Sequence, residues 1–215
     1  MNIAVMMILF NEEKFLDICL SRIIDYASKI IVVEGAVEYF WPKSNNGTST
    51  DRTNDILTAW SMQYPQKFII QHGKWDTKHD MQNAGLKLIP QTSEYIHIVD
   101  ADELYTGHAL AEIQSVLAKE KPDYVTLPMR HWHAGGIILK NGRFGKGIHR
   151  IYKNVQGFKF LPKTVNVGNT IHKEGVKKYE FKNIMCDHYG HLNPALNKEK
   201  QDYYAWREAQ WNQTQ

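Results

Sequence analysis

Apolar and polar residues alternate along the first half of the chain with two different periods. Short apolar runs, which we predict to be strands, span residues 3–10, 29–35, 67–72 and 95–100. Segments with apolar residues at helical spacing, which we predict to be helices, cover 12–27, a stretch from about 51, and 77–88. Strands that alternate with helices are typical of an α/β fold with a largely parallel sheet and helices on its faces.

The pattern changes in the second half of the chain. One more helix is predicted near residues 110–117, and Pro122 follows it. The later apolar segments are short, and they span 123–129, 135–145 and 148–153. Asn141-Gly142 is typical of a tight hairpin turn. We therefore predict an antiparallel, loop-rich second half that is followed by a charged, aromatic helix over about 194–211.

Length and composition limit the classes of protein to consider. The 215 residues suit one α/β domain, and we predict a single domain over 1–215. A dispersed net charge of +3 argues against a nucleic-acid partner. The apolar run before Glu12 is too short to span a membrane, so we predict a buried first strand and no membrane span. Cys19 and Cys186 are too few for a disulfide framework, which favours a cytoplasmic location.

Three carboxylates lie at the end of the predicted strand 95–100 or directly after it, namely Asp100, Asp102 and Glu103. Ligands of open α/β sheets bind beyond the carboxyl ends of the strands. In an extended chain, Asp100 and Asp102 would point to the same side, where two hard oxygen donors can share a divalent cation. The alternative is that Asp102 caps the next turn while Asp100 and Glu103 are solvated. The position at a strand end favours the metal site.

Four further motifs lie at strand ends or helix starts upstream of "IVDADELY". They are "LFNEE", "VVEGA", "STDRTNDIL" and "WDTKHDMQNAGL". In this order the motifs resemble family 2 of the GT-A glycosyltransferases, well over residues 3–110 and more weakly over 148–191. The resemblance implies a GT-A (Rossmann-like) mixed sheet flanked by helices. A closer resemblance, to chlorella-virus enzymes that glycosylate a capsid protein, would place the chain in the host cytoplasm.

The resemblance implies a nucleotide-sugar-binding half, about 1–105, and an acceptor half, about 106–215. The donor that it implies is a nucleotide-diphosphate sugar, with uridine as the expected base. The residues that it implies for the donor are Leu9, Asn11, Glu34, Asp76, Lys78, Asp100, Ala101 and Asp102.

Local roles compete with this interpretation at several positions. Asn11 either caps the helix that follows it or bonds the base, and Asp76 is also a candidate N-cap for the helix 77–88. Glu34 can equally be a solvated strand end.

Helix capping offers a simpler explanation for other polar residues near the helix starts. Glu12 and Glu13 fit first-turn acids that the helix dipole favours. Thr50 and Asp51 fit a local cap of the helix that begins near them. His79 is an alternative to Lys78 for a contact with the diphosphate, near a helix N-terminus where anions are favoured.

The resemblance also implies a divalent metal, Mn²⁺ or Mg²⁺, as cofactor. Asp102 is expected to bind it directly, and Asp100 either directly or through the ribose and a water. His188, in "CDHYGH", matches the late histidine that many relatives place on the metal, and His172 and His191 are substitutes.

Inverting transfer needs a base for the acceptor hydroxyl, and the usual Glu-Asp pair of the family is absent. Glu174, Asp187 and Asp76 are the candidates. The acceptor is expected to be a glycan or glycoprotein. Trp132, between His131 and His133, either stacks on a sugar or belongs to a packed aromatic turn.

Two other functions are considered. One is a non-catalytic module that binds a sugar nucleotide. The other is a nucleotidyltransferase, which usually has a glycine-rich, basic loop after the first strand, where this chain has "FNEEKF". The chain can also be part of a longer protein with further domains. The Gln-x-x-Arg-Trp motif of processive synthases is absent from the sequence, which favours the addition of one sugar per encounter.

Overall fold

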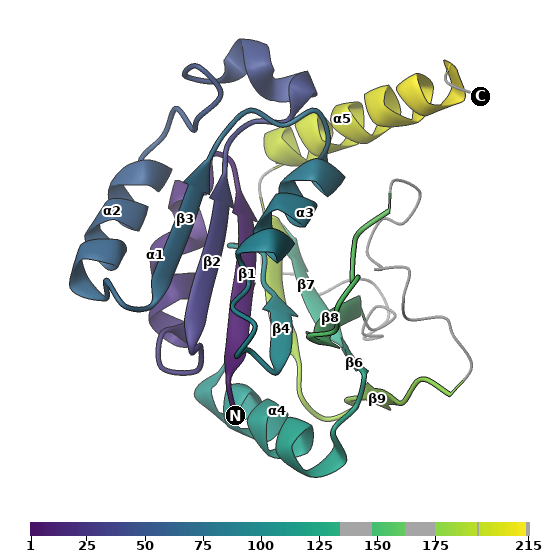
Figure 1. Cartoon of the computed structure of the whole chain (residues 1–215). Coiled ribbons are helices and arrows are strands. Elements are labelled where there is room, and N and C mark those ends of the chain that lie inside the picture. The colour runs from purple at the N-terminus through teal and green to yellow at the C-terminus, as the bar shows by residue number, and fades with distance from the viewer. Residues whose placement is uncertain (134–147, 162–174, 193, 214–215) are drawn as a thin grey trace.

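The computed structural model describes residues 1–133, 148–161, 175–192 and 194–213, and it contains two β-sheets (Figure 1). The larger sheet has the strand order β3-β2-β1-β4-β8-β6-β9 and the smaller one β5-β10-β7. The strands of the larger sheet are β1 (Ile3–Leu9), β2 (Lys29–Glu34), β3 (Phe68–His72), β4 (Tyr95–Ile98), β6 (Tyr124–Leu127), β8 (Ile148–Lys153) and β9 (Lys178–Glu180). The smaller sheet consists of β5 (Glu103–Leu104), β7 (Met129–His133) and β10 (Cys186–His191).

Five α-helices and one 3₁₀-helix accompany these strands in the described part of the chain. Their bounds are α1 (Glu13–Ile23), η1 (Glu38–Lys43), α2 (Thr53–Gln63), α3 (Lys78–Leu88), α4 (Gly107–Glu120) and α5 (Pro194–Gln213). The α/β class and the helix-flanked mixed sheet that the sequence predicts are confirmed. The short helix η1 is not predicted by the sequence pattern.

Pairing of the strands differs in part from the prediction. The first four strands are parallel, as predicted, and β8 is antiparallel to both β4 and β6. However, β9 is parallel to β6 and β10 is parallel to β7, so a purely antiparallel second half is wrong. The predicted strand 135–145 and its Asn141-Gly142 turn lie outside the described residues.

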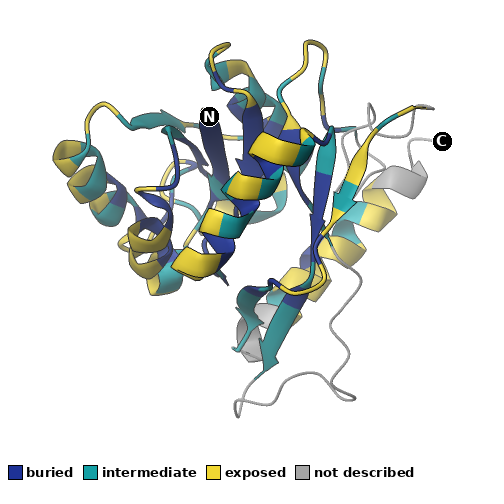
Figure 2. Cartoon of the chain, turned by 90° about the horizontal axis from the view of Figure 1, so that it is seen from below, coloured by how far each residue is buried: buried dark blue, intermediate teal, exposed yellow. Residues whose placement is uncertain are grey.

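The alternation of side chains along β1 explains why helices cover both faces of the sheet. Val5 and Met7 pack in the cluster that also holds the buried residues of α1, α2 and α4. Met6 points to the other face, where α3 lies. A Cβ on Gly85 of α3 would come within 2.6 Å of the Met6 sulfur, so this glycine lets the helix approach the sheet closely. Figure 2 shows the result, with buried strands and helices exposed on their outer sides.

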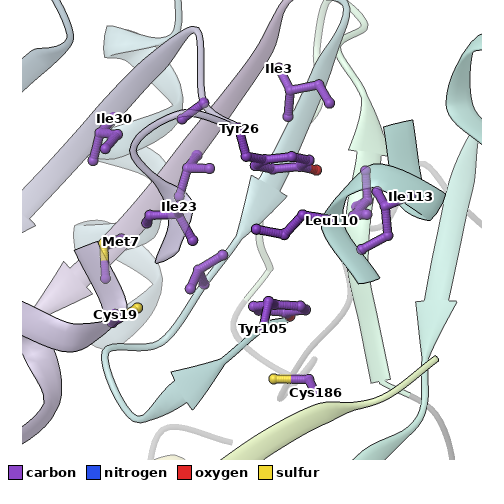
Figure 3. Packing of buried hydrophobic residues seen from close by; sticks show 14 of the residues in the cluster. Ile3, Met7, Cys19, Ile23, Tyr26, Ile30, Tyr105, Leu110, Ile113 and Cys186 are labelled. Carbon is purple, nitrogen blue, oxygen red and sulfur yellow. The ribbon is translucent and has the colours of Figure 1, made fainter. Parts of the chain in front are cut away.

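The main core fills the layer between the sheet and helices α1, α2 and α4 (Figure 3). Leu110 and Ile113 of α4 lie there beside Tyr26 and Tyr105. His97 of β4 is completely buried between the two tyrosines, and its Nδ1 lies 3.0 Å from the Tyr26 hydroxyl and its Nε2 3.2 Å from the Tyr105 hydroxyl. Both cysteines, Cys19 and Cys186, are buried free thiols.

Two predicted helix boundaries need correction. Helix α1 ends at Ile23 rather than at residue 27. Helix α3 is capped by Thr77, whose hydroxyl accepts the Asp80 N–H while the Asp80 carboxylate accepts the Thr77 N–H. Asp76 therefore is not the cap, because this reciprocal pair already satisfies the first turn.

No helix in the described part of the chain is both long and apolar enough to cross a membrane.

Candidate functional site

A cleft of about 460 Å³ lies beyond the carboxyl ends of β1 and β4, and both halves of the chain line it. Its volume falls in the range of small-ligand sites. The first half contributes the β1–α1 loop and the start of α3, and the second half contributes β10 and α5. The charged residues of the cleft include the acids Glu12, Asp100 and Asp102 and the lysines Lys14, Lys43, Lys78 and Lys200. The predicted site residues that line it are Leu9, Asn11, Lys78, Asp100, Asp102 and His188.

The acidic strand end is a turn rather than an extended chain. Strand β4 ends at Ile98, and the Glu103 N–H donates to the Asp100 carbonyl at 3.0 Å. The prediction that Asp100 and Asp102 share a direction because the chain is extended is therefore wrong. The turn nevertheless brings both carboxylates to the cleft.

Asp100 belongs to an ion triad with the buried Arg150 and Glu103, and 31% of its own side chain is exposed. Arg150 of β8 lies 2.8 Å from its Oδ2 and also contacts the carboxylate of Glu103, which is completely buried. Burial opposes ionisation of Asp100, but the charges of Arg150 and Lys78 outweigh burial and hold its pKa well below the ordinary value. Asp100 is thus an anion with its counterion already in place, and the alternative of solvated acids is wrong for Glu103, which is completely buried.

Asp102 is also buried, but its partners lie on the cleft side. Its Oδ1 lies 3.5 Å from His188 Nε2 and has no hydrogen-bond partner among the described residues. Its Oδ2 lies 3.4 Å from the Lys200 ammonium. Burial favours the neutral amine, but the carboxylates of Asp102 and Glu12 outweigh burial and raise the pKa of Lys200. A buried carboxylate oxygen without a donor suits a cation ligand.

Gly190 keeps space open between Asp102 and His188. A Cβ at this position would lie 2.6 Å from Asp102 Oδ2 and 2.8 Å from His188 Nε2. Because those distances are shorter than any ordinary contact, no larger residue fits without movement of the two side chains. The donor set therefore fits a divalent cation, with one carboxylate and one imidazole beside a space that only glycine leaves free.

Glu12 is a residue of the cleft for which the sequence predicts only a helix-dipole role. Its side chain forms no cap for α1 and instead lines the cleft. Burial, followed by the charge of Asp102, raises the pKa of Glu12 to about 8. The "NEE" motif contained this signal, because it places an acid directly after the first strand at the ligand-binding end of the sheet.

The loop before α2 closes the start of α1. Asp51 accepts the N–H of Glu13 at 3.0 Å and the N–H of Thr53, the first residue of α2, at 3.0 Å, although the N-cap residue of α2 is Arg52. Asn11 accepts the Thr50 N–H at 2.8 Å, so its side chain holds this loop rather than capping α1. Residue 11 has a φ of 55°, a left-handed conformation that asparagine tolerates.

Glu34 is bonded to other parts of the chain rather than exposed to the cleft. It is completely buried, and its carboxylate accepts the Ser49 N–H at 2.7 Å and lies 2.9 Å from His72 Nδ1. The alternative of a solvated strand end is therefore wrong. Glu34 does not line the cleft, and neither does the buried Ala101.

The three candidate bases fall in different places. Asp187 lies in β10, where Arg130 and Trp132 both donate to its carboxylate. Burial opposes ionisation of this carboxyl group, but these hydrogen bonds outweigh burial and lower the pKa of Asp187. Asp187 is therefore a weak base. Asp76 is exposed and does not line the cleft. Glu174 and the substitute ligand His172 lie outside the described residues.

The aromatic segment around Trp132 is strand β7 rather than a turn. Trp132 stacks on Tyr189 of β10 with ring centroids 6.0 Å apart, and Tyr189 stacks in turn on Phe15 at 5.4 Å. Tyr189 and Phe15 line the cleft, whereas Trp132 and its neighbours His131 and His133 do not. His79 is buried, so of the two basic residues at the start of α3 only Lys78 lines the cleft.

Sequence comparison defines the class of protein to which this fold and cleft belong. The chain matches the model of glycosyl transferase family 2 over residues 4–167, and it therefore belongs to this family. It is 31% identical over 140 residues to the SPbeta prophage-derived glycosyltransferase SunS of Bacillus subtilis (strain 168). Glycosyltransferase SunS of Bacillus phage SPbeta is similar to the same extent, and the match covers 63% of this chain and 29% of that protein.

Solved structures give the same fold. S. aureus TarS 1-349 in complex with UDP-GlcNAc superposes with a TM-score of 0.59 at 14% identity, covering 92% of this chain and 61% of that one. S. aureus TarS superposes with a TM-score of 0.56 at 13% identity, covering 88% of this chain and 37% of that one. The fold is thus GT-A-like, and the chain spans less than two thirds of the length of these relatives.

Proposed function

We propose that this chain transfers a sugar from a uridine diphosphate sugar to an acceptor hydroxyl and that the transfer depends on a divalent cation. The observation that carries the proposal is the buried Asp102 Oδ1, which faces His188 Nε2 at 3.5 Å without a hydrogen-bond partner in the described part of the chain. Membership of glycosyl transferase family 2 supports sugar transfer. The structure of TarS 1-349 in complex with UDP-GlcNAc supports a uridine nucleotide.

Asp102 and His188 would hold Mn²⁺ or Mg²⁺ in the space beside Gly190. A bound cation of this kind stabilises the negative charge that develops on the leaving diphosphate. Asp100 is held by Arg150, so in this proposal it lies beside the cation with one carboxylate oxygen already engaged.

The lysines of the cleft would bind the diphosphate. Lys78 is the first residue of α3, where the helix N-terminus also favours anions. Lys200 reaches the cleft from α5 and is held beside Asp102. Leu9 and Asn11 lie at the end of β1, where the family places the nucleoside. Glu34 supports that region indirectly, through its hydrogen bond with Ser49.

The acceptor would bind at the aromatic part of the cleft. Phe15 and Tyr189 present stacked rings there, and such faces bind sugars well, which suits a glycan or glycoprotein acceptor. The likeness to chlorella-virus enzymes, and with it a capsid acceptor, stays a prediction. Glu174 stays the predicted base, and inversion is proposed from the family alone.

The direct test is calorimetric titration with UDP, in the presence and absence of Mn²⁺. Binding should require the cation, and Asp102→Asn should weaken it at least about tenfold, since the amide replaces an anionic ligand. Asp76→Asn is the matched control, because it removes an exposed carboxylate outside the cleft. Release of UDP from UDP-sugars would separate an enzyme from a binding module.

Unchanged cation-dependent binding in Asp102→Asn would show that the assignment of this carboxylate is wrong. Binding without turnover of any UDP-sugar, with a panel of sugar acceptors present, would favour the non-catalytic module.

A further inference from the structure

Four histidines gather where β7 and β10 pair. The parallel register places His188 opposite His131 and His191 opposite His133. Residues 131 and 133 share a face because they are two apart in a strand. A β-bulge between His188 and His191 turns the second of these rings to the same side. One face of this strand pair therefore carries the imidazole rings. The neighbouring Asp187 carboxylate instead accepts a hydrogen bond from Arg130.

Three of the four rings converge closely enough to share one ion. One nitrogen from each of His131, His188 and His191 lies within 4.8 Å of the other two. The Nδ1 atoms of His131 and His188 are 2.8 Å apart, and the ring of His191 lies 5.3 Å from each of their rings. Nitrogens that each lie about 2.0–2.1 Å from one tetrahedral ion are roughly 3.3 Å apart, so the three rings would adjust their positions slightly when an ion binds.

We propose that His131, His188 and His191 form a second cation site, which binds a transition metal such as Zn²⁺. Imidazole is the preferred ligand of Zn²⁺, Co²⁺ and Ni²⁺, whereas Mg²⁺ prefers oxygen donors. Three imidazoles leave a fourth position of a tetrahedral ion open. This proposal goes beyond sugar transfer, because the histidine site can bind a metal whether or not the chain transfers a sugar.

His188 lies between the two sites. Its Nε2 faces Asp102 at 3.5 Å, and its Nδ1 faces His131 at 2.8 Å. A neutral imidazole has a free lone pair on only one nitrogen, so His188 ligates one of the two cations at a time and holds both only as imidazolate. The carboxylate site has Asp102 as its distinguishing ligand, and the histidine site has His131, which does not line the cleft. These two residues allow the sites to be tested separately.

The test is titration of the purified whole chain with Co²⁺ and observation of the visible absorption of four-coordinate cobalt, followed by displacement with Zn²⁺. The wild-type chain should bind one equivalent in this form. His131→Ala should weaken binding at least about tenfold. His108→Ala is the matched control, because it removes an exposed histidine of α4, with 86% of its side chain exposed, and should bind as the wild type does.

Asp102→Asn separates this site from the donor site. It should retain the cobalt absorption even though it loses cation-dependent UDP binding. A wild-type chain without the absorption, or a His131→Ala variant with unchanged affinity, would overturn the proposal. Loss in Asp102→Asn together with retention in His131→Ala would also overturn it, because the cobalt would then belong to the carboxylates.

Folding of the variants is checked by circular dichroism during thermal unfolding. If His131→Ala does not fold, His191→Ala replaces it in the same titration. Loss of cobalt binding in a folded His191→Ala variant supports the site, and retention overturns it.

Discussion

At the scale of single residues, the cleft depends on the absence of a side chain as much as on charged groups. An alanine at position 190 would place its methyl group against both Asp102 and His188, whereas Gly190 leaves this space free. Sequence patterns predict the carboxylate and the histidine, because their residue types have the right chemistry. They do not predict the role of Gly190, because that role depends on an approach between residues 102 and 190 that only the folded chain creates.

Gly190→Ala is predicted to weaken Mn²⁺ binding while leaving both ligands present. Overpacking of this kind costs about 1–3 kcal/mol, which corresponds to roughly fivefold to a hundredfold in affinity. Calorimetric titration with Mn²⁺ and UDP measures the change. Gly107→Ala is the control, since a Cβ there meets nothing within 4 Å. Equal affinities in the two variants would contradict the proposed cation position.

His97 predicts how stability depends on pH. Burial lowers the pKa of His97 to about 3, so the folded chain keeps this ring neutral while the unfolded chain protonates it below its ordinary pKa of 6.5. The contribution of His97 to the free energy of unfolding should therefore fall by about 1.4 kcal/mol for each pH unit from 6.5 down to 3. The stability is present above this window and is lost as the pH falls through it.

Urea unfolding at several pH values measures this dependence. His97→Gln should lack the His97 contribution to the slope, because glutamine does not titrate. His108→Gln, at an exposed position, should keep the wild-type slope. Parallel curves for His97→Gln and the wild type would contradict the prediction.

At the scale of elements, the terminal helix α5 is part of the cleft. Tyr203 is buried and packs against the rings of Tyr39 and Phe40 of η1, which fixes the helix against the first half of the chain. Lys200 then reaches Asp102. Composition predicts helix α5 itself, and apolar runs predict the strands β1 to β4. The place of α5 was not predictable, because a helix pattern shows a buried face but not the element that covers it.

Lys200→Met is predicted to weaken UDP binding about tenfold, since a charge-assisted hydrogen bond contributes roughly 1.5–3 kcal/mol. Uridine, which has no phosphate, should bind both proteins equally. Lys198→Met on the same helix is the control, because Lys198 is exposed and does not line the cleft. The same loss for UDP in both variants would point to general charge rather than a specific contact.

At the scale of the whole molecule, the two predicted halves share one sheet and one ion triad, of which Arg150 and Glu103 are buried. Strand β8 pairs with β4, and this brings Arg150 to Asp100 and Glu103. The sequence indicated the acids but not the arginine, because 50 residues separate Arg150 from Asp100. Local patterns contain no information about such a pair.

Arg150→Met is predicted to lower the free energy of unfolding by about 3–5 kcal/mol, because it leaves the buried Glu103 and the partly exposed Asp100 without their counterion. Lys153→Met, on the same strand, removes only an exposed pair with Asp123 and should cost about 0–1 kcal/mol. Urea titration of the three proteins measures the difference. Equal losses would contradict a special role for the triad.

The triad also constrains the order in which the chain can acquire its native structure during synthesis. Strand β4 and its acids leave the ribosome well before the arginine that neutralises them, since the partners are 50 residues apart. A nascent chain that ends near residue 105 would bury the Glu103 carboxylate, with Asp100 beside it, without a cation, at a cost of several kcal/mol. We therefore expect the acidic end of the sheet to stay hydrated until β8 has been made, so that the ligand-binding end forms late.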